Sequence, residues 1–140
     1  MRVLLGVTGS IAAYKACELV RLLVKDGHEV LPVLTPEAEA FVTPQTFAGL
    51  ARREPLSELY PHLAQVDLLV VAPLSANTLA KLAHGLADNV LTEAALAFRG
   101  PFLVAPAMNV RMWEHPATQA NVAKLRERGV ELVGPESGEL

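Results

Sequence analysis

Three stretches of the sequence place small or polar residues at the end of a buried apolar run, where they could bind a ligand. The first, "GVTGSIAAYK", joins such a run to a helical segment. Gly9 permits a tight turn, Ser10 can cap the helix, and the free N–H groups at a helix start suit a phosphate. The glycine spacing fits neither the dinucleotide motif G-x-G-x-x-G nor the P-loop motif. This turn predicts either a capped helix start or a site for the phosphate of a mononucleotide.

The second stretch, "APLSANT", puts the hydrogen-bonding side chains of Ser75, Asn77 and Thr78 directly after another apolar run. Such side chains could bind the edge of a polar heterocycle, although Ser75 or Asn77 could equally cap the following helix. Several polar strand ends that converge on one edge of a sheet favour a ligand site over isolated caps.

The third stretch, "PAMNVRMW", holds two of the three methionines and the only tryptophan of the chain. The amide of Asn109 could bind a carboxylate, and Met108 and Met112 could pack against a flat ring or a thiol-bearing chain. Trp113 could close a pocket or fill a subunit interface. The alternative is a methionine-rich filler beneath a loop.

His62 is the histidine that we consider for acid–base chemistry, because its ordinary pKa permits proton transfer near neutral pH. It lies shortly before the third apolar run. His28 and His84 are expected to be structural, and His115, which precedes a proline, is expected to cap a helix or a turn. No spacing of His, Cys or carboxylate residues is typical of a metal site, and no G-x-S-x-G motif indicates a nucleophilic serine.

Five near-continuous apolar runs predict buried parallel strands, with amphipathic helices between them. The predicted strands are Arg2–Val7, His28–Leu34, Asp67–Ala72, Pro101–Ala105 and Val130–Val133. The predicted helices are Ile11–Lys25, Pro36–Phe41, Pro44–Arg53, Thr78–Leu86, Asp88–Phe98 and Pro116–Arg128. This alternation predicts one α/β domain over residues 1–140, a doubly wound parallel sheet in a Rossmann- or flavodoxin-like three-layer sandwich. Ligands of such sheets bind beyond the carboxyl ends of the strands, where the three stretches fall.

The composition narrows the class of protein. Hydrophobic residues make up 51% and aromatic residues 5% of the chain, which predicts an aliphatic core. The net charge of −3, with dispersed basic residues, predicts no nucleic-acid partner. No apolar run is long enough to predict a membrane span. A single cysteine, Cys17, and a start without signal-peptide features favour a reducing, cytoplasmic setting.

Taken together, "GSIAAYK", His62, "PLSANT" and "PAMNVRMW" resemble the flavin-dependent cysteine decarboxylase family over essentially the whole chain. The signature P-x-M-N-x-x-M-W of that family is met in full by Pro106, Met108, Asn109, Met112 and Trp113. The flavin motif usually reads P-A-S-A-N-T, and Leu74 replaces its first alanine here.

The resemblance implies an FMN-dependent lyase that decarboxylates 4'-phosphopantothenoylcysteine to 4'-phosphopantetheine in coenzyme A biosynthesis. His62 would be the active-site base, Asn109 would bind the substrate carboxylate, and Met112 would line the substrate pocket. Family members assemble as homotrimers or multiples of trimers, up to a homododecamer, with the flavin between subunits. The residues implied for FMN are Gly9, Ser10, Ile11, Thr35, Phe41, Ser75, Ala76, Asn77, Thr78 and Met108.

The family pattern also implies a substrate flap that begins with an A-C-G tripeptide where the printed sequence stops, and the cysteine of that tripeptide would donate a proton. Cys17 lies in the first predicted helix and cannot take this role. Three other functions stay open: a flavin prenyltransferase-like enzyme, a peptide-cysteine oxidative decarboxylase, and a non-catalytic flavin-binding subunit. His62 together with the P-x-M-N-x-x-M-W signature argues against the prenyltransferase.

Overall fold

A five-stranded parallel sheet forms the centre of the computed structural model, which describes residues 1–135. The strands are β1 (Arg2–Val7), β2 (Glu29–Leu34), β3 (Leu68–Leu74), β4 (Phe102–Pro106) and β5 (Glu131–Leu132). Their order in the sheet is β2-β1-β3-β4-β5. The chain builds outward from β1 to β2 and then returns to the other side for β3, so the order switches between β1 and β3. Ligands of doubly wound sheets bind at such a switch point.

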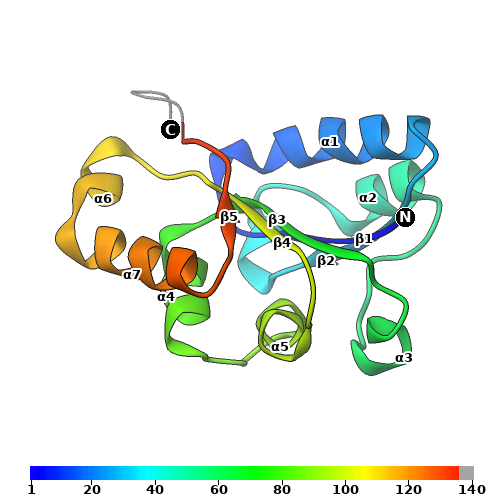
Figure 1. The fold of residues 1–140 in the computed structure, drawn as a ribbon. Coiled ribbons are helices and arrows are strands. Elements are labelled where there is room, and N and C mark those ends of the chain that lie inside the picture. The colour runs from blue at the N-terminus through cyan, green and yellow to red at the C-terminus, as the bar shows by residue number, and fades with distance from the viewer. Residues whose placement is uncertain (136–140) are drawn as a thin grey trace.

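Helices cover both faces of the sheet, as Figure 1 shows. On one face lie α1 (Tyr14–Lys25) and α2 (Pro44–Ala51), and the short helices η1 (Ile11–Ala13) and η2 (Pro36–Ala40) follow β1 and β2. The other face carries α4 (Ala76–His84), α5 (Val90–Ala97) and α7 (Pro116–Glu127). Two single-turn helices, α3 (Tyr60–Leu63) and α6 (Val110–Glu114), lie at opposite ends of the sheet. The three-layer sandwich predicted from the sequence is confirmed.

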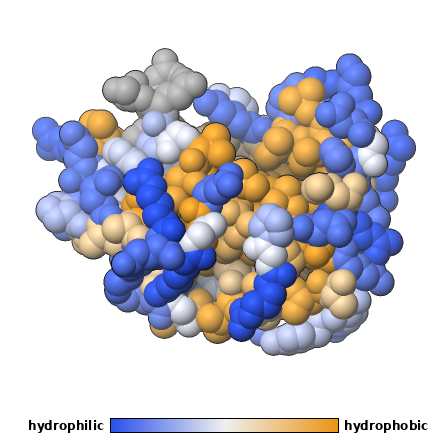
Figure 2. Space-filling view, viewed as in Figure 1, coloured by the Kyte–Doolittle hydropathy of each residue, from blue (hydrophilic) through white to orange (hydrophobic). Residues whose placement is uncertain are grey.

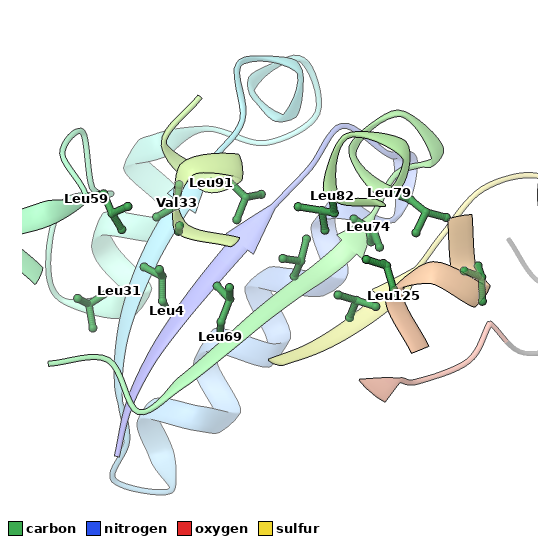
Figure 3. Close-up of a cluster of buried hydrophobic side chains, with 14 of the residues drawn as sticks. Leu4, Leu31, Val33, Leu59, Leu69, Leu74, Leu79, Leu82, Leu91 and Leu125 are labelled. Carbon is green, nitrogen blue, oxygen red and sulfur yellow. The ribbon is translucent and has the colours of Figure 1, made fainter. Parts of the chain in front are cut away.

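The core is aliphatic and divides into two clusters, one on each face of the sheet. Leu4 of β1 points into the larger cluster with Leu69 and Leu91, and Figure 3 shows these leucines packed under α4 and α5. The next residue, Leu5, points into the second cluster, beneath α1 and α2. Because side chains alternate along a strand, a run that is apolar at every position supplies both clusters.

The boundaries differ from the predicted ones in ways that short-range interactions explain. The predicted helix Ile11–Lys25 begins as a 3₁₀ turn, and Pro36–Phe41 forms a 3₁₀ helix only, with Thr35 accepting a hydrogen bond from the N–H of Ala38. The predicted strand Val130–Val133 pairs over two residues. The sequence missed α3 and α6, because four- and five-residue helices are too short to display a helical period.

Within residues 1–135, no helix combines the length and apolarity that crossing a membrane requires.

Gly6 of β1 is required by packing. A Cβ atom at this position would overlap the side chain of Leu91, which presses on the sheet from α5. We expect Gly6→Ala to lower the free energy of unfolding by about 1–3 kcal/mol, since the leucine must shift in a filled core. Urea unfolding measures this loss.

The matched control is Gly49→Ala in α2, where an added Cβ meets no atom within 4 Å. Alanine there should raise stability by roughly 0.5–1 kcal/mol through the helix backbone alone. Equal effects of the two substitutions would contradict the packing role of Gly6.

Candidate functional site

Thr8 ties together the ends of β1 and β3, the two strands that flank the switch point. It is fully buried, and its hydroxyl donates a hydrogen bond to the carbonyl of Pro73 at 2.7 Å. The same oxygen accepts a hydrogen bond from the N–H of Ser75 at 2.8 Å. Two of the stretches singled out in the sequence therefore share one anchor. Sequence reasoning missed Thr8, although a lone hydroxyl between a buried strand and a glycine was a usable signal.

The turn after β1 presents backbone N–H groups that have no acceptor among the described residues. No described residue accepts a hydrogen bond from the backbone N–H groups of Gly9, Ser10 or Ile11. Successive free N–H groups in a turn form a concavity that suits phosphate. A Cβ atom on Gly9 would lie 2.8 Å from the Cβ of Glu37, so only glycine lets this turn pack against η2. The arrangement fits the predicted phosphate site, and Ser10 also caps its helix by accepting from Ala12 N–H at 3.0 Å.

Thr35 and Phe41 flank this turn from the β2 side. Thr35 is buried, and its hydroxyl donates to the carbonyl of Val7 at 3.4 Å while accepting from Ala38 N–H at 3.3 Å. Its hydroxyl is thus occupied within the protein. Phe41 is half-exposed at the end of η2, so its ring is accessible to a ligand.

The turn after β3 divides its polar residues between structure and surface. Ser75 caps α4 by accepting from the N–H of Thr78 at 3.2 Å, and Thr78 is buried. Asn77 is exposed and Ala76 is half-buried. Of the four residues predicted to bind a heterocycle here, Asn77 is the one with a polar side chain open to a ligand.

Asn109 follows β4 and caps α6. Its Oδ1 accepts a hydrogen bond from the N–H of Met112 at 2.9 Å, so the amide nitrogen is the end left to donate to a ligand. An exposed donor with a fixed orientation suits a carboxylate.

The two methionines beside Asn109 have different surroundings. Met108 is 7% exposed and belongs to the core cluster, against which Trp113 also packs. Met112 is 46% exposed. It lines a groove of about 540 Å³ together with Ala76, Asn109, Val110, Arg111, His115 and Thr118. Met108 therefore mainly fills space, whereas Met112 faces the groove.

His62 lies at the opposite end of the sheet from Asn109, near the amino ends of the strands. It belongs to α3, which precedes β3, and Asp67 just after it donates its N–H to the carbonyl of Arg2 at the start of β1. Figure 1 shows α3 at the far end of the sheet from α6. Within one chain, the structure does not bring His62 and Asn109 together.

Two further expectations concern metal binding and cysteine chemistry. Among residues 1–135, no group of three or more His, Cys, Asp or Glu side chains is arranged to hold a metal ion. Cys17 is partly buried in α1, and burial raises the pKa of its thiol. The segment that would lead into the flap, residues 136–140, lies outside the described residues, so that expectation stays a prediction.

Comparison with known proteins identifies the family. The sequence model of the Flavoprotein family matches residues 1–140. The chain belongs to the Flavoprotein family. It is 43% identical to the probable phosphopantothenoylcysteine decarboxylase of Streptococcus mutans, over 99% of this chain and 85% of that protein. It is 44% identical to the coenzyme A biosynthesis bifunctional protein CoaBC of Mycobacterium tuberculosis, again over 99% of this chain. The chain spans 35% of that bifunctional protein.

Solved structures agree with the fold. The FMN-dependent cysteine decarboxylase SpaF superposes with a TM-score of 0.90 at 37% identity, covering 99% of this chain and 86% of that one. A PPC decarboxylase mutant complexed with pantothenoylaminoethenethiol gives a TM-score of 0.82 at 34% identity, with the same coverage. The resemblance to flavin-dependent cysteine decarboxylases that the motifs predicted is confirmed.

The anchor at Thr8 can be tested by Thr8→Val, which keeps the shape of the side chain and removes the hydroxyl. We expect the free energy of unfolding to fall by about 1–3 kcal/mol, because the N–H of Ser75 is left without an acceptor. The midpoint of urea unfolding measures the change.

Thr46→Val is the matched control, since the hydroxyl of Thr46 bonds only to Thr43 on the exposed surface. It should change stability by less than about 0.5 kcal/mol. A Thr8→Val variant as stable as this control would show that the hydroxyl of Thr8 does not anchor the ends of β1 and β3.

Proposed function

We propose that this chain is an FMN-dependent decarboxylase that converts 4'-phosphopantothenoylcysteine to 4'-phosphopantetheine. The observation that carries the proposal is that the Gly9–Ile11 turn after β1, with its free N–H groups, and the exposed amide of Asn109 after β4 both lie at the carboxyl end of the parallel sheet. One feature suits the phosphate of a cofactor and the other the carboxylate of a substrate. The 43% identity to a probable phosphopantothenoylcysteine decarboxylase supports the same function.

The residues at the strand ends have distinct roles in this proposal. The N–H groups of Gly9, Ser10 and Ile11 bind the FMN phosphate, while Phe41 and Asn77 border the ring. Bound FMN would supply the two-electron redox chemistry at the thiol-bearing carbon of the substrate. Asn109 would hold the carboxylate that departs, and His62 would accept the proton of the substrate thiol.

The position of His62 requires a second copy of the chain. Because α3 and α6 lie at opposite ends of one subunit, the base must come from a neighbouring subunit. The amino ends of that neighbour's strands would then meet the carboxyl ends of the strands in this subunit. Ile11 and Tyr14 near the site are 75% and 64% exposed. They line a groove of about 650 Å³ with Val133 and residues of α1 and β4. Figure 2 shows hydrophobic residues gathered over the middle of the molecule's face. These features support a homo-oligomer, for which the family resemblance implies a trimer or a multiple of trimers.

A second candidate is the oxidative decarboxylation of a peptide that ends in cysteine. It is favoured by the similarity to the peptidyl-cysteine decarboxylase EpiD, at a TM-score of 0.86 and 26% sequence identity. The two candidates differ in product, because the peptide reaction ends at an enethiol while the coenzyme A reaction ends at a saturated thiol. Relative to its substrate, an enethiol product has lost CO₂ and two hydrogen atoms, whereas a saturated thiol has lost CO₂ alone. Mass spectrometry of the product distinguishes these two mass losses.

The cofactor can be tested directly. We expect the purified protein to be yellow and to release FMN on denaturation. Riboflavin should bind at least about 100-fold more weakly than FMN, because it lacks the charged group that the Gly9–Ile11 turn binds. Titration of the apoprotein followed by flavin fluorescence measures both affinities. A colourless protein that takes up no added FMN would refute the proposal.

The shared site can be tested by complementation. His62→Asn removes the base, and Asn109→Asp places a carboxylate against that of the substrate, so each variant alone should be inactive while retaining FMN. Mixed oligomers of the two should regain about a quarter of wild-type turnover, because one interface in four pairs an intact His62 with an intact Asn109. CO₂ release from co-expressed protein measures the recovery.

The control is co-expression of His62→Asn with a second copy of the same variant carrying a different tag. That mixture should stay inactive. If the mixture of His62→Asn and Asn109→Asp also stays inactive although oligomers form, the site does not draw on two copies.

A further inference from the structure

We propose that the groove beside α6 binds the phosphate monoester end of the substrate, at the N-terminus of α7. The binding groups are Thr118, His115 and Arg111. This inference rests on the proposed decarboxylase function and adds a site that reads the end of the substrate remote from the cysteine.

Thr118 is the residue that points to a ligand. It is 9% exposed and lines the groove, yet among the described residues its hydroxyl has no hydrogen-bond partner. The other hydroxyls discussed above, those of Thr8, Thr35 and Ser75, are all engaged. Among the described residues, the one fully buried side-chain N or O atom without a partner is Nε of Arg53, so the hydroxyl oxygen of Thr118 is open to the groove and can bond an oxygen atom that enters it.

The start of α7 supplies further donors at the same place. Pro116 has no N–H, and the N–H of Ala117 donates to Nδ1 of His115 at 3.0 Å. The N–H of Thr118 has no acceptor among the described residues. Because α7 is a helix of twelve residues, its N-terminus also carries a partial positive charge. The backbone N–H and the hydroxyl of Thr118 belong to one residue, so both can donate to one anion in the groove.

His115 and Arg111 complete the set. Nδ1 of His115 accepts the hydrogen bond from Ala117, which leaves Nε2 as the ring nitrogen that carries a proton and can donate. Arg111 is exposed on α6 and contributes a guanidinium group to the groove. None of the described residues that line the groove is acidic. A phosphate therefore meets donors and positive charge with no opposing carboxylate.

The layout of the groove matches a substrate with an anion at each end. Asn109, the proposed carboxylate anchor, and Thr118, the proposed phosphate contact, come from different helices that border one groove. Ala76, Val110 and Met112 provide apolar lining, and Val110 and Met112 are each 46% exposed. An uncharged arm that joins the two anionic ends would lie against these residues. A cysteine-ending peptide lacks the phosphate and would gain nothing from Thr118.

The test compares phosphopantothenoylcysteine with its dephosphorylated form, pantothenoylcysteine, as substrates. For the double variant Arg111→Gln, Thr118→Val, we expect kcat/KM on the phosphorylated substrate to fall on the order of 100-fold, since a charged contact and a donor are lost. On the dephosphorylated substrate kcat/KM should change by less than about threefold. Thr118→Ser, which keeps the hydroxyl, should retain the preference for phosphate.

Arg126→Gln is the charge-matched control, because Arg126 lies in the last turn of α7 at the opposite end of the helix. Arg126→Gln should leave kcat/KM unchanged on both the phosphorylated and the dephosphorylated substrate. Melting temperature and FMN content verify that each variant folds. If the double variant does not fold, the same comparison of the two substrates is made with Arg111→Gln alone. An equal loss on both substrates, or no loss on either, would overturn the phosphate site while the decarboxylase function stands. Wild-type protein that turns over neither substrate would overturn both.

Discussion

The hydroxyl of Thr8 is the interaction on which the rest of the site depends. A doubly wound sheet opens a crevice between the strands where its order reverses, and in this protein those strands are β1 and β3. Thr8 spans that crevice at its base by bonding to both Pro73 and Ser75. The turn that presents the free N–H groups of Gly9–Ile11 and the turn that begins α4 are thereby held in fixed relation. The two separate loops then behave as one preorganised surface.

A second constraint is that polar residues at the strand ends serve the fold before they serve a ligand. Ser10, Ser75 and Asn109 each use a side-chain oxygen to cap the helix that follows. Capping fixes the rotamer of the side chain and determines which atoms remain. For Asn109 the carbonyl oxygen accepts from the N–H of Met112, so the end of the side chain left free is the amide N–H₂, a donor. One hydrogen bond therefore both caps the helix and determines which end of the amide is free.

The sequence predicted the sheet, its flanking helices and the strand ends that form the site, because each rests on patterns within a few residues. Buried runs such as Leu68–Leu74 reveal strands without reference to the rest of the chain. What the sequence could not reveal depends on distant partners. The role of Thr8 lies in its contact with residues more than sixty positions away. The burial of Met108 follows from core packing, and the remoteness of His62 from Asn109 follows from the direction of parallel strands.

In the proposed oligomer, the separation of α3 from α6 also determines what kind of contact joins two subunits. A surface at one end of a chain must meet a different surface at the other end of its neighbour, so the contact is head-to-tail rather than two-fold symmetric. Such contacts close only when the rotation between neighbours completes a ring, and otherwise they propagate as a filament. Within the proposed assembly, catalysis then depends on protein concentration. Dilution that separates the ring would abolish turnover while every subunit stays folded.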